Sequence, residues 1–393
     1  MLLTRLRGLV TDQVDPRAIG VTRAGVGTAA LIVGTELGGY LATLAAPGAL
    51  RLPQVQAIAT PVIAVWPLML GLWAVASVAF AIGLETTVAG AALVILAVAF
   101  FLTDAQLYTN HLYLLTLVVA VLTLAGAGRG FSLDARRRGA DNLEPVPAWG
   151  PFQIKVQITL LYAFSALAKL NGSYLSGSVM ASYLRTDGPL AIPGSWRSFQ
   201  VMFVLSVLAI SVEALLAVGL WIPRWRRNAF VAGLFLHLGI LVTFQPALPF
   251  AAFGLLTLSL YVPFLDAASG SRLIIWDGSC SFCGSWVRWW RRLDWLGALR
   301  FAPMDEPGVL DENGITALAA AEALHVVGPE DTRRGFGAVR AVAEVLPISF
   351  LWAPLLSLPP IQWLGERAYA AVARRRSCSV APGPRPADSK ASA

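Results

Sequence analysis

Long runs of apolar residues dominate the first two thirds of the chain. A helix needs about 20 apolar residues to cross a bilayer core, and roughly eight runs approach that length. They cover residues 24–46, 57–83, 86–103, 110–127, 152–172, 199–221, 229–245 and 248–265, with Pro- and Gly-rich breaks between several of them. The pattern predicts a mostly α protein whose residues 24–265 form a polytopic transmembrane bundle of about eight helices.

The pattern changes at Arg272. LIIW, ALRFAPMD and ALHVVG read as three short strands, SFCGSWVRWWRRLDWL has helical spacing, and GAVRAVAEVL is an amphipathic helix. TALAAAEA suits either a helix or a strand. We expect an α/β domain over 272–378, after a cytoplasmic segment over 1–23 and the membrane bundle, and a disordered tail over 379–393. The apolar stretch LWAPLLSLPPIQWL suits either a core or a surface that lies against the bilayer.

The composition agrees with a membrane protein. Hydrophobic residues make up 56% and charged residues 13%, whereas ordinary globular chains carry roughly 25% charged residues. The net charge of +7 is interpreted as setting orientation and lipid contact, not as a nucleic-acid surface. The chain shows no phosphate-binding loop, no HExxH and no GxSxG motif.

The arginines predict how the bundle is oriented. With eight spans and a cytoplasmic N-terminus, the outer loops hold only Arg51, Arg185 and Arg197. The cytoplasmic segments hold Arg5, Arg7, Arg17, Arg23, Arg129, Arg136, Arg137, Arg138, Arg224, Arg226 and Arg227. Basic residues accumulate in cytoplasmic loops. We therefore expect a multi-pass protein of the cell membrane with both termini in the cytoplasm.

Cys280 and Cys283 form a Cys-x-x-Cys pair after strand LIIW and a short turn, where the next helix begins. A helix N-terminus stabilises a thiolate and lowers its pKa. Cys280 is then expected to be the exposed nucleophile and Cys283 the resolving thiol. Asp277 has two interpretations: it tunes or deprotonates a thiol, or it caps the helix.

Three alternatives compete with a redox dithiol. A structural zinc site would need Cys378 and His325 as further ligands. A permanent disulfide is disfavoured in a reducing cytosol. The spacing could also arise by chance. A cycling dithiol is favoured over all three.

A family resemblance supports the dithiol. IIWDGSCSFCGSWVRWWRR resembles the opening of the DCC thiol-disulfide oxidoreductases, named for their Asp-x-x-Cys-x-x-Cys motif, and RFAPMD, GFGAVRAVAEVLP and RAYAAVARRRSC fit later segments. The resemblance covers about 105 residues. It implies a thioredoxin-like fold with Asp277, Cys280 and Cys283 at the site. No Pro immediately precedes ALHVVG, where a cis-Pro of a typical thioredoxin would face the cysteines.

Ionisable residues inside the spans are few. Each costs about 2.5–3.5 kcal/mol on insertion scales and so needs a partner or a use. They are Glu36, Asp104, His111, Lys169, Glu213 and His237. The expected topology lets the two histidines and the lysine converge in the outer half of the bilayer, with Asp104 as their only nearby acid. The alternative is that His111 and Lys169 snorkel near helix ends and His237 is a hydrogen-bonded core residue.

A second resemblance concerns this region. TNHLYLLTL, LLYAFSALAKLNGSYLSG and VEALLAVGLWIPRWRRNAFVAGLFLHLGILVTF look like the HTTM domain, which vitamin K-dependent gamma-glutamyl carboxylases share. The resemblance places His111 and Lys169 near an active site, with a deprotonated lysine in quinol-oxygen chemistry, and gives Glu213 and His237 less certain places there. Carboxylation is not expected, because the chain runs directly from Leu265 to Arg272 without the large lumenal domain.

Three functions follow from these patterns. The first is a membrane-anchored thiol-disulfide oxidoreductase acting on a protein or small-molecule thiol or disulfide. The second is a quinone- or lipid-handling membrane enzyme whose soluble domain senses redox state. The third is a non-enzymatic scaffold or transporter. No cofactor is required by the first, a quinone is the cofactor of the second, and the lipid bilayer is a partner in all three.

Overall fold

The computed structural model describes residue 8 and residues 11–139, 143–265 and 272–375. The chain forms two compact units, Met1–Ala267 and Ala268–Ala393. The expected tail over 379–393, and Cys378, lie outside the described residues. Each unit is described by itself.

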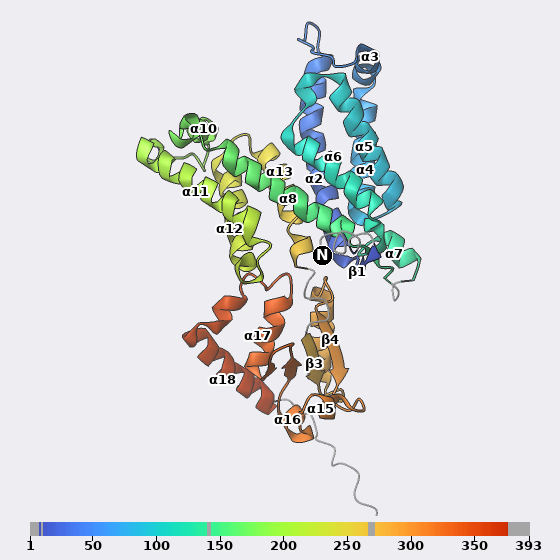
Figure 1. Ribbon diagram of the computed structural model, residues 1–393, viewed down its shortest axis with the longest axis vertical. Coiled ribbons are helices and arrows are strands. Elements are labelled where there is room, and N and C mark those ends of the chain that lie inside the picture. The colour runs from blue at the N-terminus through green and yellow to red at the C-terminus, as the bar shows by residue number, and fades with distance from the viewer. Residues whose placement is uncertain (1–7, 9–10, 140–142, 266–271, 376–393) are drawn as a thin grey trace, which may run out of the picture. The chain divides into compact units, whose positions relative to one another are not determined.

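The first unit is helical (Figure 1). Its main helices are α2 (Arg17–Ala45), α3 (Gln56–Ala64), α4 (Trp66–Ile82), α5 (Thr86–Thr103), α6 (Asn110–Leu124), α8 (Trp149–Ala168), α11 (Phe199–Gly219), α12 (Pro223–Thr243) and α13 (Ala247–Ser259). α2 packs against α4 and α13, and α8 packs against α11. Shorter helices follow the ends of several of these, including α7 (Leu133–Arg137), α9 (Gly172–Leu175) and α10 (Ser178–Tyr183).

All eight apolar runs are helical, and a membrane bundle followed by an α/β domain is confirmed. Within the described residues, four helical segments are long and apolar enough to cross a bilayer, namely Arg17–Ala45, Thr86–Thr103, Phe199–Gly219 and Ala247–Phe264. The run 57–83 is not one straight helix, because α3 and α4 bend by 83°. Pro61 inside α3 and Pro67 in the first turn of α4 explain the break. Counted as one span, this bent pair gives five candidate spans among the described residues, fewer than the eight predicted.

The first helix begins at Arg17, earlier than the predicted residue 24, because Arg23 is buried within the bundle. Its guanidinium donates hydrogen bonds to the carbonyls of Phe80, Ala81 (2.8 Å) and Phe131 (2.7 Å). Phe80 and Ala81 lie in the last turn of α4, where helix carbonyls lack helical partners. Arg23 is therefore a structural cation that joins α2 to α4, not a charge in a flanking loop.

Replacing Arg23 with Ala should destabilise the first unit by about 2–3 kcal/mol, because three carbonyls lose a charged donor. The measurement is the thermal unfolding midpoint of the detergent-solubilised protein. Arg17→Ala is the matched control, since Arg17 is partly exposed and contacts only Asp15 among its described ion pairs. Equal midpoints for the two variants would contradict the role given to Arg23.

The second unit contains a four-stranded sheet of order β4-β3-β5-β6. β3 (Arg272–Trp276) and β4 (Leu299–Pro303) are parallel, whereas β5 (His325–Val327) is antiparallel to β3, with Ile275 opposite His325. β6 (Thr332–Arg334) is antiparallel to β5. The three predicted strands are present, and β6 is a fourth. The parallel pair needs a crossover, which helix α14 (Ser281–Leu293) supplies.

Helices cover both faces of this sheet. One core joins Ile274 and Val326 of the strands to Trp290 of α14 and Val342 of α17 (Phe336–Val345). On the other face Ile275 packs with residues of α15 (Val309–Glu312) and α16 (Ala317–Glu322), so TALAAAEA is helical. The last helix, α18 (Pro359–Arg375), follows the short helix η6 (Ala353–Ser357).

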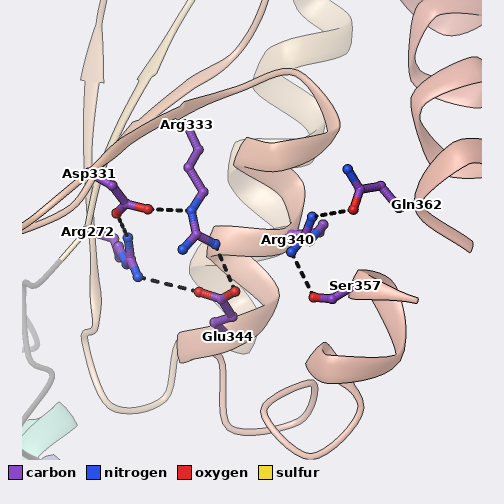
Figure 2. A network of polar contacts seen from close by, with 7 residues as sticks. All are labelled: Arg272, Asp331, Arg333, Arg340, Glu344, Ser357 and Gln362. Atoms are coloured by element: carbon purple, nitrogen blue, oxygen red, sulfur yellow. Dashed lines mark hydrogen bonds and ion pairs between the residues drawn. The ribbon is translucent and has the colours of Figure 1, made fainter. Parts of the chain in front are cut away.

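A polar network fixes α17 in the second unit (Figure 2). Arg272 of β3 and Arg333 of β6 both donate to Asp331, at 2.9 and 2.5 Å, and both also reach Glu344 of α17. From the other side of α17, Arg340 donates to Ser357 and Gln362. The network therefore ties β3, β6 and α17 together and connects α17 to the C-terminal segment.

The Asp331 carboxylate gives this network a pH dependence. Partial burial acts to raise the pKa of Asp331, but hydrogen bonds and charge from Arg333 and Arg272 outweigh it and lower the pKa below 3.8. The contribution of Asp331 to folding stability is therefore fully present above its pKa in the unfolded chain. It is lost as pH falls through its lower pKa in the folded protein. Asp331→Asn should cost about 1 kcal/mol or less at neutral pH.

The measurement is the difference in unfolding midpoint between wild type and Asp331→Asn across pH. It should shrink toward zero below about pH 4, where the unfolded carboxyl is protonated. Glu330→Gln, an exposed neighbour in the same turn, is the control and should change little at any pH. A difference that stays constant down to low pH would contradict this account.

Candidate functional site

The Cys-x-x-Cys pair occupies the start of α14. Cys280 is the N-cap residue, and its carbonyl accepts the helix's first hydrogen bond, from the Gly284 N–H at 2.9 Å. Cys283 lies in the first turn. The location that the sequence predicted, after a strand and a turn and at a helix N-terminus, agrees with the structure. This position favours a thiolate through the helix dipole.

The burial of the two cysteines differs from the prediction. Only 4% of Cys280 is exposed, while Cys283 is half-buried. Cys280 is disulfide-bonded and Cys283 is not its partner. The prediction of an exposed Cys280 is therefore wrong for this state of the domain. The first turn of α14 presents Cys283 at a cavity.

The Asp277 carboxylate organises the turn before the cysteines. It is buried, and its Oδ1 accepts hydrogen bonds from the backbone N–H and the hydroxyl of Ser279, at 3.0 and 2.6 Å. The Cys280 N–H donates to the Asp277 carbonyl at 3.1 Å. Gly278 fits closely, since a Cβ there would lie 3.0 Å from Pro303. These contacts hold the turn that positions Cys280.

A cavity of about 270 Å³ opens beside Cys283. Its lining is almost wholly apolar, and it comes from α14, α17, α18 and Leu324. Phe282 and Trp286 line it from α14, and Gly365 and Val372 line it from α18. A Cβ on Gly365 would collide with the Phe336 ring, so glycine allows α18 to pack closely here. Within the second unit, Cys283 therefore faces an apolar space.

Leu324, which lines the cavity directly before strand β5, is hydrogen-bonded on both sides. The Leu324 N–H donates to the Tyr369 hydroxyl of α18 at 2.9 Å, and the Leu324 carbonyl accepts from the Gly335 N–H at 3.0 Å. This residue stands where the sequence lacks a proline before strand β5. Its backbone N–H and carbonyl are thus both hydrogen-bonded within the domain.

His325, one of the residues considered for a metal site, lies within β5. Its Nδ1 donates to the Ala323 carbonyl at 2.9 Å. Burial lowers the pKa of His325; the hydrogen bond opposes this and Arg334 adds to it. The part of the chain that the structure describes contains no group of three or more His, Cys, Asp or Glu side chains placed to hold a metal ion.

The ionisable residues of the first unit form separate groups. His111 of α6 pairs with Glu36 of α2, with 2.6 Å between Nε2 and Oε2. Lys169, directly after α8, contacts both oxygens of Glu213 on α11, at 2.6 and 2.7 Å, and the Ser165 hydroxyl at 2.5 Å. Each of these bases thus has an acid of its own.

The third base belongs to a buried cluster of hydroxyl groups. The His237 Nε2 lies 2.7 Å from the Tyr162 hydroxyl and 3.0 Å from that of Thr257, and Tyr162 also contacts the Tyr261 hydroxyl at 2.6 Å. No hydrogen bond or ion pair between described residues joins His111 to Lys169 or His237.

Asp104 was expected to be the only acid near the three bases, and this is wrong. Asp104 is a cap: it accepts from the backbone N–H groups of Leu52 and Gln106. Sequence reasoning missed Tyr162 and Ser165 as partners. Helical spacing was the available signal, because Tyr162, Ser165 and Lys169 follow each other at intervals of three and four residues and share one face.

Comparison with known families agrees with this architecture. The model of the HTTM domain matches residues 12–264. The chain belongs to the HTTM family. A second model, DCC1-like thiol-disulfide oxidoreductase, matches residues 274–379, which include the Cys-x-x-Cys pair and its cavity. Both resemblances found in the sequence are thereby confirmed. Searches of curated proteins and of solved structures give no match. The protein is a membrane-associated HTTM protein that carries a DCC1-like thiol-disulfide oxidoreductase domain.

Proposed function

We propose that the protein is a membrane-anchored thiol-disulfide oxidoreductase in which Cys280 and Cys283 cycle between dithiol and disulfide on the cytoplasmic side. The single observation that carries this proposal is the pair's position at the N-terminus of α14 in a DCC1-like domain, with one sulfur at an open cavity. Asp277 supports the pair by holding the preceding turn through Ser279.

The proposed cycle consists of two successive thiol-disulfide exchange steps. The Cys280 thiolate attacks a substrate disulfide, so that a mixed disulfide forms and one substrate thiolate leaves. The Cys283 thiolate then attacks the Cys280 sulfur and expels the second substrate thiolate. Two electrons pass to the substrate and a Cys280–Cys283 disulfide remains. An external dithiol restores the reduced pair by the same exchange in reverse.

Before Cys280 can attack a substrate, its disulfide must be reduced and its sulfur must become accessible. Because Cys283 is a thiol in the first turn of the same helix, exchange onto the Cys280 sulfur would release whatever Cys280 holds. Cys283 has open space beside it for an incoming group. In this proposal Cys283, at the cavity, has the resolving role, and Cys280 has the attacking role once its sulfur is released.

The test is a redox titration of the full-length protein with only Cys280 and Cys283 kept, after Cys378→Ser. Alkylation at defined dithiothreitol potentials should show one two-electron transition, with both thiols lost together. Independent one-electron behaviour, or no oxidation at any potential, would sink the proposal. Alkylation by a membrane-impermeant maleimide should occur only in permeabilised cells; labelling in intact cells would contradict the cytoplasmic location.

A second candidate is a quinone- or lipid-handling activity of the HTTM domain. The observation that favours it is the buried His237 cluster with the Lys169–Glu213 pair, since intramembrane polar groups commonly mark functional sites. The resemblance to the carboxylases implies a deprotonated lysine, whereas in this structure Lys169 contacts the Glu213 carboxylate. Purified protein would have to bind a naphthoquinone, and Lys169→Ala would have to abolish turnover without unfolding the protein.

A further inference from the structure

Helix α14 carries an exposed row of aromatic rings. Phe282, Trp286 and Trp289 recur at intervals of four and three residues and so share one face, with 43%, 44% and 50% of each residue exposed. Their rings touch edge to face, with centroids 6.4 and 5.6 Å apart. Val287 and Trp290 of the same helix are buried, so this aromatic row is not the side that forms the core.

Helix α18 carries a matching apolar row. Ile361, Leu364 and Val372 lie on one face, and 38%, 61% and 44% of each residue is exposed. Both rows reach the same opening, because Phe282 and Trp286 of α14 and Val372 of α18 line the Cys283 cavity. The six residues of the two rows are together called the apolar face. Such a face on an otherwise soluble domain marks an interaction site.

The two helices that carry these rows have a net positive charge. α14 contains Arg288, Arg291 and Arg292 and no acidic residue. Between residues 359 and 374, α18 contains Arg367 and Arg374 against the single acid Glu366. The five arginines are exposed. Aromatic rings beside arginines suit the headgroup region of an anionic bilayer, where rings reach the acyl boundary and guanidinium groups reach phosphates.

The length of the chain keeps this domain near a bilayer. The last helical span ends at Phe264, and strand β3 begins at Arg272. Eight residues reach at most about 28 Å when fully extended. This short linker keeps the domain close to the bilayer, so the local concentration of lipid is high. Even weak binding to anionic lipid would then suffice for docking.

We propose that the DCC1-like domain docks on the anionic surface of its own membrane through the apolar face of α14 and α18. The mouth of the Cys283 cavity, which lies within this face, then opens toward the lipid. Docking does not depend on the cysteines being redox-active, so this inference and the proposed function can fail separately.

The test uses the full-length protein in nanodiscs, with Cys280, Cys283 and Cys378 replaced by Ser and unfolding checked against wild type. Single nitroxide labels are placed at Trp289→Cys and Leu364→Cys on the apolar face. Glu312→Cys on α15, which covers the other face of the sheet, and Glu366→Cys on α18 are controls outside the apolar face. Collision with a water-soluble nickel chelate and with oxygen is measured by power-saturation EPR.

The expected result is several-fold lower nickel accessibility at positions 289 and 364 than at 312 and 366 in discs containing phosphatidylglycerol. This protection should weaken in pure phosphatidylcholine and at high salt. Equal nickel accessibility at all four positions would overturn the proposal. So would protection that is unchanged in neutral discs, or dipolar coupling between labels of two chains, because these outcomes indicate a protein contact or a second copy on the face.

Discussion

Replacing Cys280 with Ser should reduce disulfide-reductase turnover of the full-length protein by roughly 10³-fold or more, the scale seen when a covalent nucleophile is removed. The attacking sulfur would be gone, and no mixed disulfide should form. Cys283→Ser should also stop turnover, but for a different reason. The attack by Cys280 would still occur, and the mixed disulfide would accumulate because its resolving thiol is missing.

The measurement is turnover with a reducible peptide disulfide, together with mass spectrometry of the trapped species. Ser285→Ala, on the exposed side of the same helix, is the matched control and should keep most of the activity, because the proposed cycle does not use the Ser285 hydroxyl. If the Cys280→Ser/Cys283→Ser protein retained reductase activity, the chemistry would lie elsewhere. If Cys280→Ser were the variant that trapped substrate, the two roles would be reversed.

The placement of the cysteines was predictable because it depends on local sequence. A strand, a three-residue turn and a helix fix the Cys280 backbone within about ten residues of chain, and hydropathy and turn residues report such elements directly. The same holds for the helices of the membrane bundle. Strand β6 was missed for the complementary reason: Thr332–Arg334 is short, polar and without apolar alternation.

The cavity was not predictable because its walls come from distant segments. Tyr369 reaches Leu324 across 45 residues, and Gly365 contacts Phe336 across 29. No periodicity encodes such a meeting. Arg23 is a similar case, since hydropathy counts its charge but not the carbonyls of Phe80 and Phe131 that receive its hydrogen bonds. Exposure of Cys280 was misjudged because burial depends on this tertiary packing.

The partners of the intramembrane bases were also unpredictable, because they come from segments that are distant in the sequence. The sequence revealed that Lys169 and Glu213 are unusual, but their pairing joins α11 to the residue that follows α8 across 44 positions. Only the spacing of Ser165 and Lys169 on one helix was readable. The pairing changes the expected effect of substitutions, because removing either partner leaves the other without its counter-charge in an apolar setting.

Glu213→Gln should therefore destabilise the protein by about 3–5 kcal/mol, the range for breaking a buried ion pair. Glu213 is buried and accepts from both the Lys169 ammonium and the Ser165 hydroxyl. Lys169→Met should cost a similar amount. The double variant Lys169→Met/Glu213→Leu should be much closer to wild type than the sum of the single effects, because it leaves no unpaired charge.

The measurement is the free energy of unfolding in mixed micelles for the two single variants and the double variant. Lys155→Met is the matched control, since Lys155 lies earlier on α8 and its ammonium lies 5.6 Å from the centre of the Phe264 ring. A stable Lys169→Met protein would show that the ion pair contributes little to folding. Burying a charged pair at no gain in stability would then favour a chemical role for Lys169, because an intramembrane charge that does not stabilise the fold is retained for a use.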